Sequence, residues 1–93
     1  MKNKKIILIR KKLDKLDLKM LSIIKQRSLL VNKILSEKKF KNQIVDQKRI
    51  SKILKSIRKK SLQNNIDPKI TNRIWKNMIW SYIDFERRNF KKK

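Results

Sequence analysis

The sequence predicts an all-α fold with three helices per chain, and two observations support this prediction. The 93 residues include no glycine and one proline, whereas sheet-rich domains usually need glycine in their tight turns. Apolar residues also recur at steps of three and four, which is the spacing of one helical face. The length indicates one small domain, residues 1–93, with a modest core that gains from oligomerisation.

Residues 4–39 are predicted to form one long first helix, because no glycine or proline interrupts them. At ~1.5 Å per residue this helix would be about 50 Å long. A compact domain of this size has a radius of gyration of only about 12–13 Å. The helix should therefore extend beyond its own subunit and pack against a second chain, which predicts a homodimer.

Two further helices are predicted over residues 47–62 and 68–90. Asp46 can cap the first of them. Asp67 and Pro68 combine an N-cap residue with proline at the first helical position, which is a strong start signal for the second. Residues 91–93 are expected to be a frayed tail.

The composition excludes several classes of chemistry. Without cysteine or histidine, the chain has no disulfides, thiol nucleophiles, imidazole bases or usual zinc ligands, so no metal is expected. No apolar run approaches the ~18 residues of a membrane span, and the basic N-terminus lacks a signal-peptide core. A cytoplasmic protein without a membrane partner is expected. The net charge of +22 attracts polyanions and small anions alike.

One cation interrupts the apolar seam of the first helix. The seam consists of Ile9, Leu13, Leu16, Met20, Ile23, Arg27, Leu30 and Ile34. A buried guanidinium needs an anion, and the chain has seven acidic residues against 29 basic ones. The partner of Arg27 could be a bound anion or a carboxylate of a second chain. Lys38 shares the face of Arg27, whereas Arg10 lies about 25 Å away along the helix. One small ligand therefore cannot contact Arg10 and Arg27 of the same helix. It could contact Arg27 of one chain and Arg10 of an antiparallel partner.

Five segments, in order, resemble a known family: residues 9–17, 21–27, 34–38 and 44–49, and the last helix with Trp75 and Glu86. The first four are similar to R-x-x-I/L-D-x-I/L-D, L-x-x-L-L-x-x-R, I-x-x-x-K and V-x-D-x-x-R. These are motifs of the all-helical (AroQ-class) chorismate mutases. The resemblance implies an intertwined six-helix homodimer that converts chorismate to prephenate, without a cofactor, in phenylalanine and tyrosine biosynthesis (the shikimate pathway).

The resemblance also implies a role for each site residue. Arg27 and the partner's Arg10 would bind the two carboxylates of chorismate, and Lys38 would contact its ether oxygen and a carboxylate. The remaining predicted site residues are Asp46 and Arg49 on the hydroxyl side, Tyr82 at the family's late-helix serine, and Glu86 as second donor to the ether oxygen. Asp46 could alternatively serve only as a helix cap, and Glu86 could be an exposed residue near the C-terminus.

Two other functions remain open. Where the family usually has glutamate for the substrate hydroxyl, this chain has Ile50, which keeps an isochorismate pyruvate-lyase on the same scaffold as an alternative. A basic helical nucleic-acid-binding protein is the second alternative, and it predicts steep salt dependence. It gives no reason for a cation in the apolar seam, so nucleic acid is not the expected partner.

Overall fold

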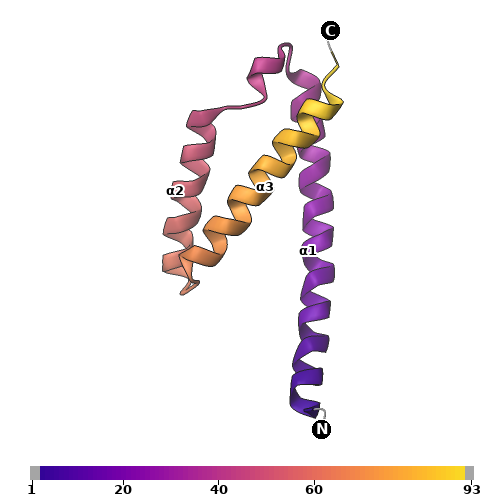
Figure 1. Cartoon of the computed structure of the whole chain (residues 1–93), viewed down its shortest axis with the longest axis vertical. Coiled ribbons are helices and arrows are strands. Elements are labelled where there is room, and N and C mark those ends of the chain that lie inside the picture. Colours follow the sequence, from indigo (N-terminus) through magenta and orange to yellow (C-terminus); the bar gives the residue numbers. More distant parts are fainter. Residues whose placement is uncertain (1–2, 92–93) are drawn as a thin grey trace. The chain divides into compact units, whose positions relative to one another are not determined.

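The computed structural model describes residues 3–91, which fold into three α-helices and one short 3-10 helix (Figure 1). These elements are α1 (Lys4–Glu37), η1 (Lys41–Gln43), α2 (Gln47–Gln63) and α3 (Pro68–Asn89). No strand occurs between residues 3 and 91, so the predicted all-α fold with three helices and a long first helix is confirmed. Of the expected tail at residues 91–93, residues 92 and 93 lie outside the described part of the chain.

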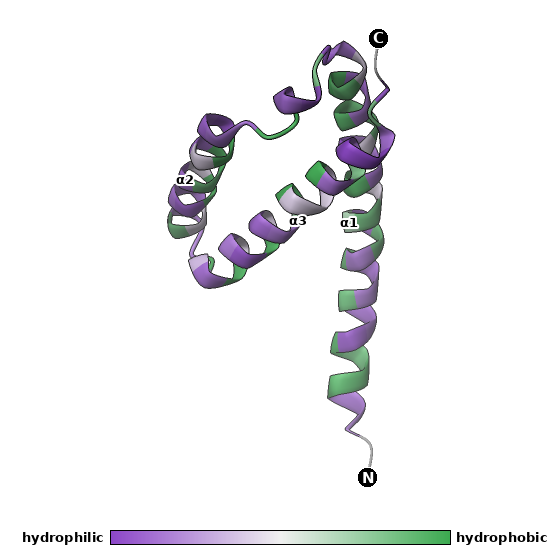
Figure 2. Ribbon diagram, turned by 45° about the horizontal axis from the view of Figure 1, so that its top comes forward, coloured by the Kyte–Doolittle hydropathy of each residue, from purple (hydrophilic) through white to green (hydrophobic). Residues whose placement is uncertain are grey.

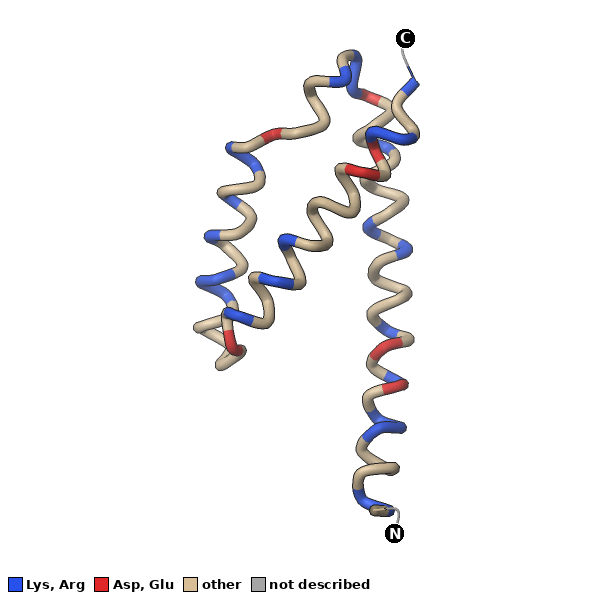
Figure 3. The backbone as a smooth tube through the Cα atoms, viewed as in Figure 1, with Lys and Arg blue, Asp and Glu red and all other residues tan. Residues whose placement is uncertain are grey.

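The chain divides into two compact units, the first ending at Val31 and the second beginning at Asn32. The single domain expected over residues 1–93 therefore stays a prediction. Lysine and arginine residues occur along every helix, and α2 carries no acidic residue at all (Figure 3). None of the helices in the described region is both long and apolar enough to cross a membrane.

The first unit consists mainly of the N-terminal part of α1, and Asn3 caps the start of this helix. The Oδ1 atom of Asn3 accepts hydrogen bonds from the backbone N–H groups of Lys5 and Ile6, at 3.0 and 3.4 Å. Apolar segments recur along α1 as green bands between purple ones in Figure 2, as expected for the apolar seam. Its side chains are open to solvent; Leu16 is 52% exposed and Ile23 is 55% exposed.

The helix α1 ends at Glu37, two residues earlier than expected. The N–H group of Lys38 still donates to the Leu35 carbonyl oxygen, at 3.1 Å. The next two N–H groups, of Lys39 and Phe40, donate instead to the side-chain oxygen of Gln43. Because these two N–H groups bind Gln43, they do not form the backbone hydrogen bonds that would continue the helix.

The second unit has a small core. Three of its apolar residues are buried: Leu35 at the end of α1, Ile44 after η1, and Ile83 in α3. The helices α2 and α3 are in contact and converge toward the turn that joins them (Figure 1). A buried hydrogen bond of 2.7 Å joins the hydroxyl groups of Ser61 and Thr71 across them, so the polar groups in this contact are satisfied.

Both helix starts in the second unit follow the predicted capping chemistry. The Oδ1 atom of Asp46 accepts from the Arg49 N–H at 3.0 Å, and that of Asp67 accepts from the Lys69 N–H at 2.9 Å. Pro68 is the first residue of α3. The predicted capping roles of Asp46 and Asp67 are confirmed, because each satisfies a donor that the first helical turn leaves free.

The turn between α2 and α3 depends on Asn65, whose φ of 56° lies in the left-handed region. We expect Asn65→Ala to lower the free energy of unfolding by about 1 kcal/mol, whereas Asn65→Gly should not lower it. Urea-induced unfolding measures both. Asn72, which is exposed within α3, provides the control, since Asn72→Ala removes the same side chain from a helical backbone and should not lower the free energy of unfolding. Equal stability of the two Asn65 variants would contradict this reading of the turn.

Candidate active site

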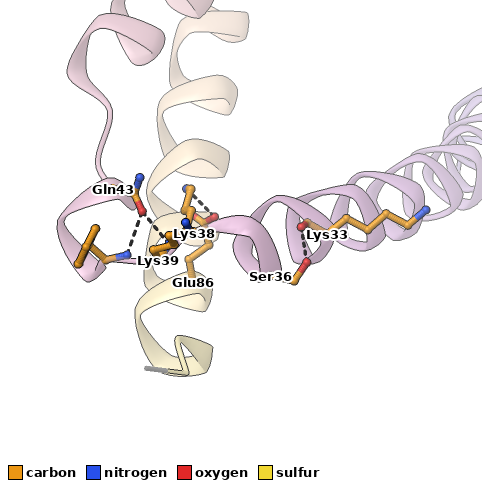
Figure 4. Close-up of polar contacts among 7 residues, drawn as sticks. Lys33, Ser36, Lys38, Lys39, Gln43 and Glu86 are labelled. Atoms are coloured by element: carbon orange, nitrogen blue, oxygen red, sulfur yellow. Dashed lines mark hydrogen bonds and ion pairs between the residues drawn. The ribbon is translucent and has the colours of Figure 1, made fainter. Parts of the chain in front are cut away.

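An ion pair between Lys38 and Glu86 lies at the centre of the candidate site (Figure 4). The Nζ atom of Lys38 is 2.9 Å from Oε1 of Glu86, and the two side chains are 19% and 7% exposed. Glu86 lies one turn after the buried Ile83 on α3, so its carboxylate is held at the edge of the core. A nearly buried carboxylate of this kind requires a cationic or hydrogen-bonding partner.

Lys38 is placed by two features of the chain. It follows the last residue of α1, and the connector that comes next is fixed by Gln43. The Oε1 atom of Gln43 accepts from the N–H groups of Lys39 and Phe40, at 2.8 and 2.9 Å (Figure 4). The ammonium group therefore extends from a backbone whose path is held on both sides.

An open hollow of about 590 Å³ adjoins this connector. Its lining residues are Lys38, Asn42, Gln43, Val45, Asp46, Gln47 and Lys48. Two predicted site residues, Lys38 and Asp46, thus line the same hollow. The lining combines cations, amides and one carboxylate, and its cationic and amide groups are hydrogen-bond donors of the kind that suit an anion.

The other two predicted residues of the second unit, Arg49 and Tyr82, lie outside the hollow. Arg49 is exposed on the first turn of α2, and its backbone N–H binds the carboxylate of Asp46. Tyr82 is half-buried on α3, four residues before Glu86. Neither Arg49 nor Tyr82 is among the residues that line the hollow.

The two remaining predicted residues, Arg10 and Arg27, belong to the first unit. Both are exposed on α1, and neither forms an ion pair with any acidic residue among residues 3–91. They are 17 residues apart on one helix, which separates them by about 25 Å. Each guanidinium is therefore available to an anion from outside the described chain.

Comparison with known families shows to which family the chain that carries these residues belongs. The sequence model of the chorismate mutase type II family matches residues 9–87. The chain belongs to this family. No curated protein and no solved structure matches the chain significantly.

The part of the chain that matches the chorismate mutase type II family contains the whole candidate site. It begins one residue before Arg10 and ends one residue after Glu86. All seven predicted site residues therefore lie inside the chorismate mutase domain, and the resemblance inferred from the sequence is confirmed.

Gln43 was not among the residues predicted from the sequence, although its side chain fixes the connector beside Lys38. A weak signal existed, because Gln43 is three residues after Phe40 and a glutamine at the third position of a helix often binds back to the cap. Phe40 lacks the side-chain oxygen of a usual N-cap residue, so the pattern was incomplete.

Proposed function

We propose that this chain is a chorismate mutase, which rearranges chorismate to prephenate without a cofactor and thereby serves phenylalanine and tyrosine synthesis. The observation that carries the proposal is the match of the chorismate mutase type II family over residues 9–87. Because the rearrangement is unimolecular and needs no nucleophile, a chain without cysteine or histidine can catalyse it.

The substrate would be held as a dianion between two chains. Arg27 and the partner subunit's Arg10 would each bind one carboxylate, and guanidinium groups suit this task because they form two parallel hydrogen bonds. Holding both carboxylates would select the compact conformer in which the reacting carbons lie close together. That selection lowers the entropic part of the barrier.

The second part of catalysis would act on the ether oxygen, where negative charge develops as the carbon–oxygen bond breaks. Lys38, and Glu86 through a protonated carboxyl, would each donate to this oxygen. Lys38 donates to Oε1 of Glu86 at 2.9 Å in the structure, so the two side chains are adjacent and an oxygen beside the pair would lie within reach of both. Such preorganised donors in a partly water-excluded site stabilise the transition state.

The exposed seam of α1 supports an intertwined dimer. Seven apolar residues of the seam are between 49% and 58% exposed: Ile9, Leu13, Leu16, Met20, Ile23, Leu30 and Ile34. Fully burying such a side chain contributes about 1.5–3 kcal/mol, while only three apolar residues are buried among residues 3–91. A second copy of the chain would cover the seam and bring the partner subunit's Arg10 to Arg27.

The direct test is the loss of chorismate absorbance by the purified protein, with identification of the product. Prephenate is expected. Ile50, which is half-buried on α2, favours the isochorismate pyruvate-lyase as second candidate because it offers no hydroxyl acceptor. The same assay with isochorismate decides between them: release of pyruvate without prephenate formation from chorismate would replace the proposal by the lyase.

The role of Glu86 as a donor predicts which replacements retain activity. The amide of glutamine can donate a hydrogen bond to the ether oxygen, whereas alanine offers no donor, so Glu86→Gln should keep kcat/KM within about tenfold of wild type and Glu86→Ala should lower it by about 10²–10³-fold. Glu37→Ala, at an exposed glutamate, should leave kcat/KM unchanged. Equal losses in Glu86→Gln and Glu86→Ala would exclude Glu86 as the donor.

A further inference from the structure

The connector directly after Lys38 is held by one side-chain atom. The N–H groups of Lys39 and Phe40 both donate to Oε1 of Gln43, at 2.8 and 2.9 Å. Since both partners are donors, the atom that faces them is the amide oxygen. Two successive peptide groups after Lys38 are thus fixed by Gln43, where solvent would otherwise compete for them.

Gln43 is itself anchored on both sides. Its own N–H group donates to the Phe40 carbonyl oxygen at 3.0 Å, so the side chain and backbone of Gln43 close a reciprocal contact with Phe40. The next residue, Ile44, is 4% exposed and belongs to the small core of this unit. The backbone of Gln43 is therefore fixed next to the core. Its amide oxygen in turn fixes the backbone beside Lys38.

We propose that Gln43 is a positioning residue that acts through Lys38, an inference that rests on the proposed chorismate mutase function. Lysine has a long, flexible side chain, and ordering it costs conformational entropy. The backbone that Gln43 fixes determines where the Lys38 ammonium can reach, and Glu86 holds its far end at 2.9 Å. Gln43 needs no contact with the reacting atoms, because a displacement of about 1 Å at a catalytic group can reduce the rate about 10²-fold.

Two variants separate the acceptor from the volume of the side chain. Gln43→Met has a similar size but no amide oxygen, and we expect it to lower kcat by about tenfold with KM changed less than about threefold. Gln43→Glu keeps an oxygen that can accept both N–H groups, and kcat should stay within about threefold of wild type. Gln63 is exposed at the end of α2 and does not line the hollow, so Gln63→Met is the matched control and should retain full kcat.

A double-mutant cycle then distinguishes positioning from general structure. If Gln43 acts through Lys38, Gln43→Met should cost less than about twofold in kcat once Lys38→Met is present. The same tenfold loss in both backgrounds would overturn the inference. So would a Gln43→Glu variant as impaired as Gln43→Met.

A readout without activity keeps this inference separate from the proposed function. An inactive wild-type chain would refute the chorismate mutase proposal alone. In that case the coupling between Lys38→Met and Glu86→Gln is measured as the non-additive part of the change in Tm. The coupling should fall by at least about half when Gln43→Met is added, and an undiminished coupling would overturn the role of Gln43.

Discussion

Lys38→Met is expected to lower kcat/KM for chorismate by about 10²–10³-fold, the usual effect of removing one preorganised donor to a developing oxyanion. The substitution keeps most of the side-chain volume but removes the charge that lies 2.9 Å from Glu86. It should also lower Tm, because Glu86 is then buried without its cationic partner. Steady-state kinetics and thermal unfolding measure the two effects.

Lys39→Met is the matched control for this prediction, because Lys39 is the next residue, is exposed and forms no ion pair among residues 3–91. It should change neither kcat/KM nor Tm appreciably. The double variant Lys38→Met/Glu86→Gln removes the unpaired charge and should recover part of the lost Tm, but not the activity. Activity of Lys38→Met within about fivefold of wild type would contradict the role of Lys38 as a donor.

Arg27→Ala is expected to lower kcat/KM by about 10²–10³-fold as well, since it removes a bidentate contact to a substrate carboxylate. The loss should appear in KM as well as in kcat, because this carboxylate is bound in the ground state and also fixes the reactive conformer. Kinetics over a wide range of chorismate concentrations measure both parameters.

Arg58→Ala controls for the loss of one positive charge from a chain of net charge +22. Arg58 is exposed on α2 and outside the predicted site, so its removal should leave kcat/KM within about twofold, as expected for a distant, screened charge. Prephenate formation that survives Arg27→Ala undiminished would refute the placement of the substrate on α1.

The helices could be predicted closely because their ends carry local signals. The Asp67-Pro68 start, the Asp46 cap and the uninterrupted residues 4–37 are all readable from short segments. The end of α1 was placed two residues too late because the competing acceptor, Gln43, lies in the following turn. No helical periodicity reveals such a side-chain cap.

The identities of the site residues could be predicted more readily than the contacts between them. Lys38 and Glu86 are 48 residues apart in the chain, and their pairing depends on how α3 returns to the end of α1. The hydrogen bond between Ser61 and Thr71 depends in the same way on the path of the α2–α3 turn. The anion that would pair with Arg27 stays a prediction, since it would come from a ligand or a second chain.

The central claim is that chorismate is rearranged at a site completed by two chains, and one measurement tests it directly. Arg10→Ala and Arg27→Ala proteins are prepared separately, unfolded together and refolded, and prephenate formation is compared with that of wild type and of each variant. Random pairing puts half of the chains in mixed dimers, each with one intact site, so about a quarter of the wild-type activity should return. Wild-type protein that forms no prephenate, or a mixture no more active than its components, would contradict the claim.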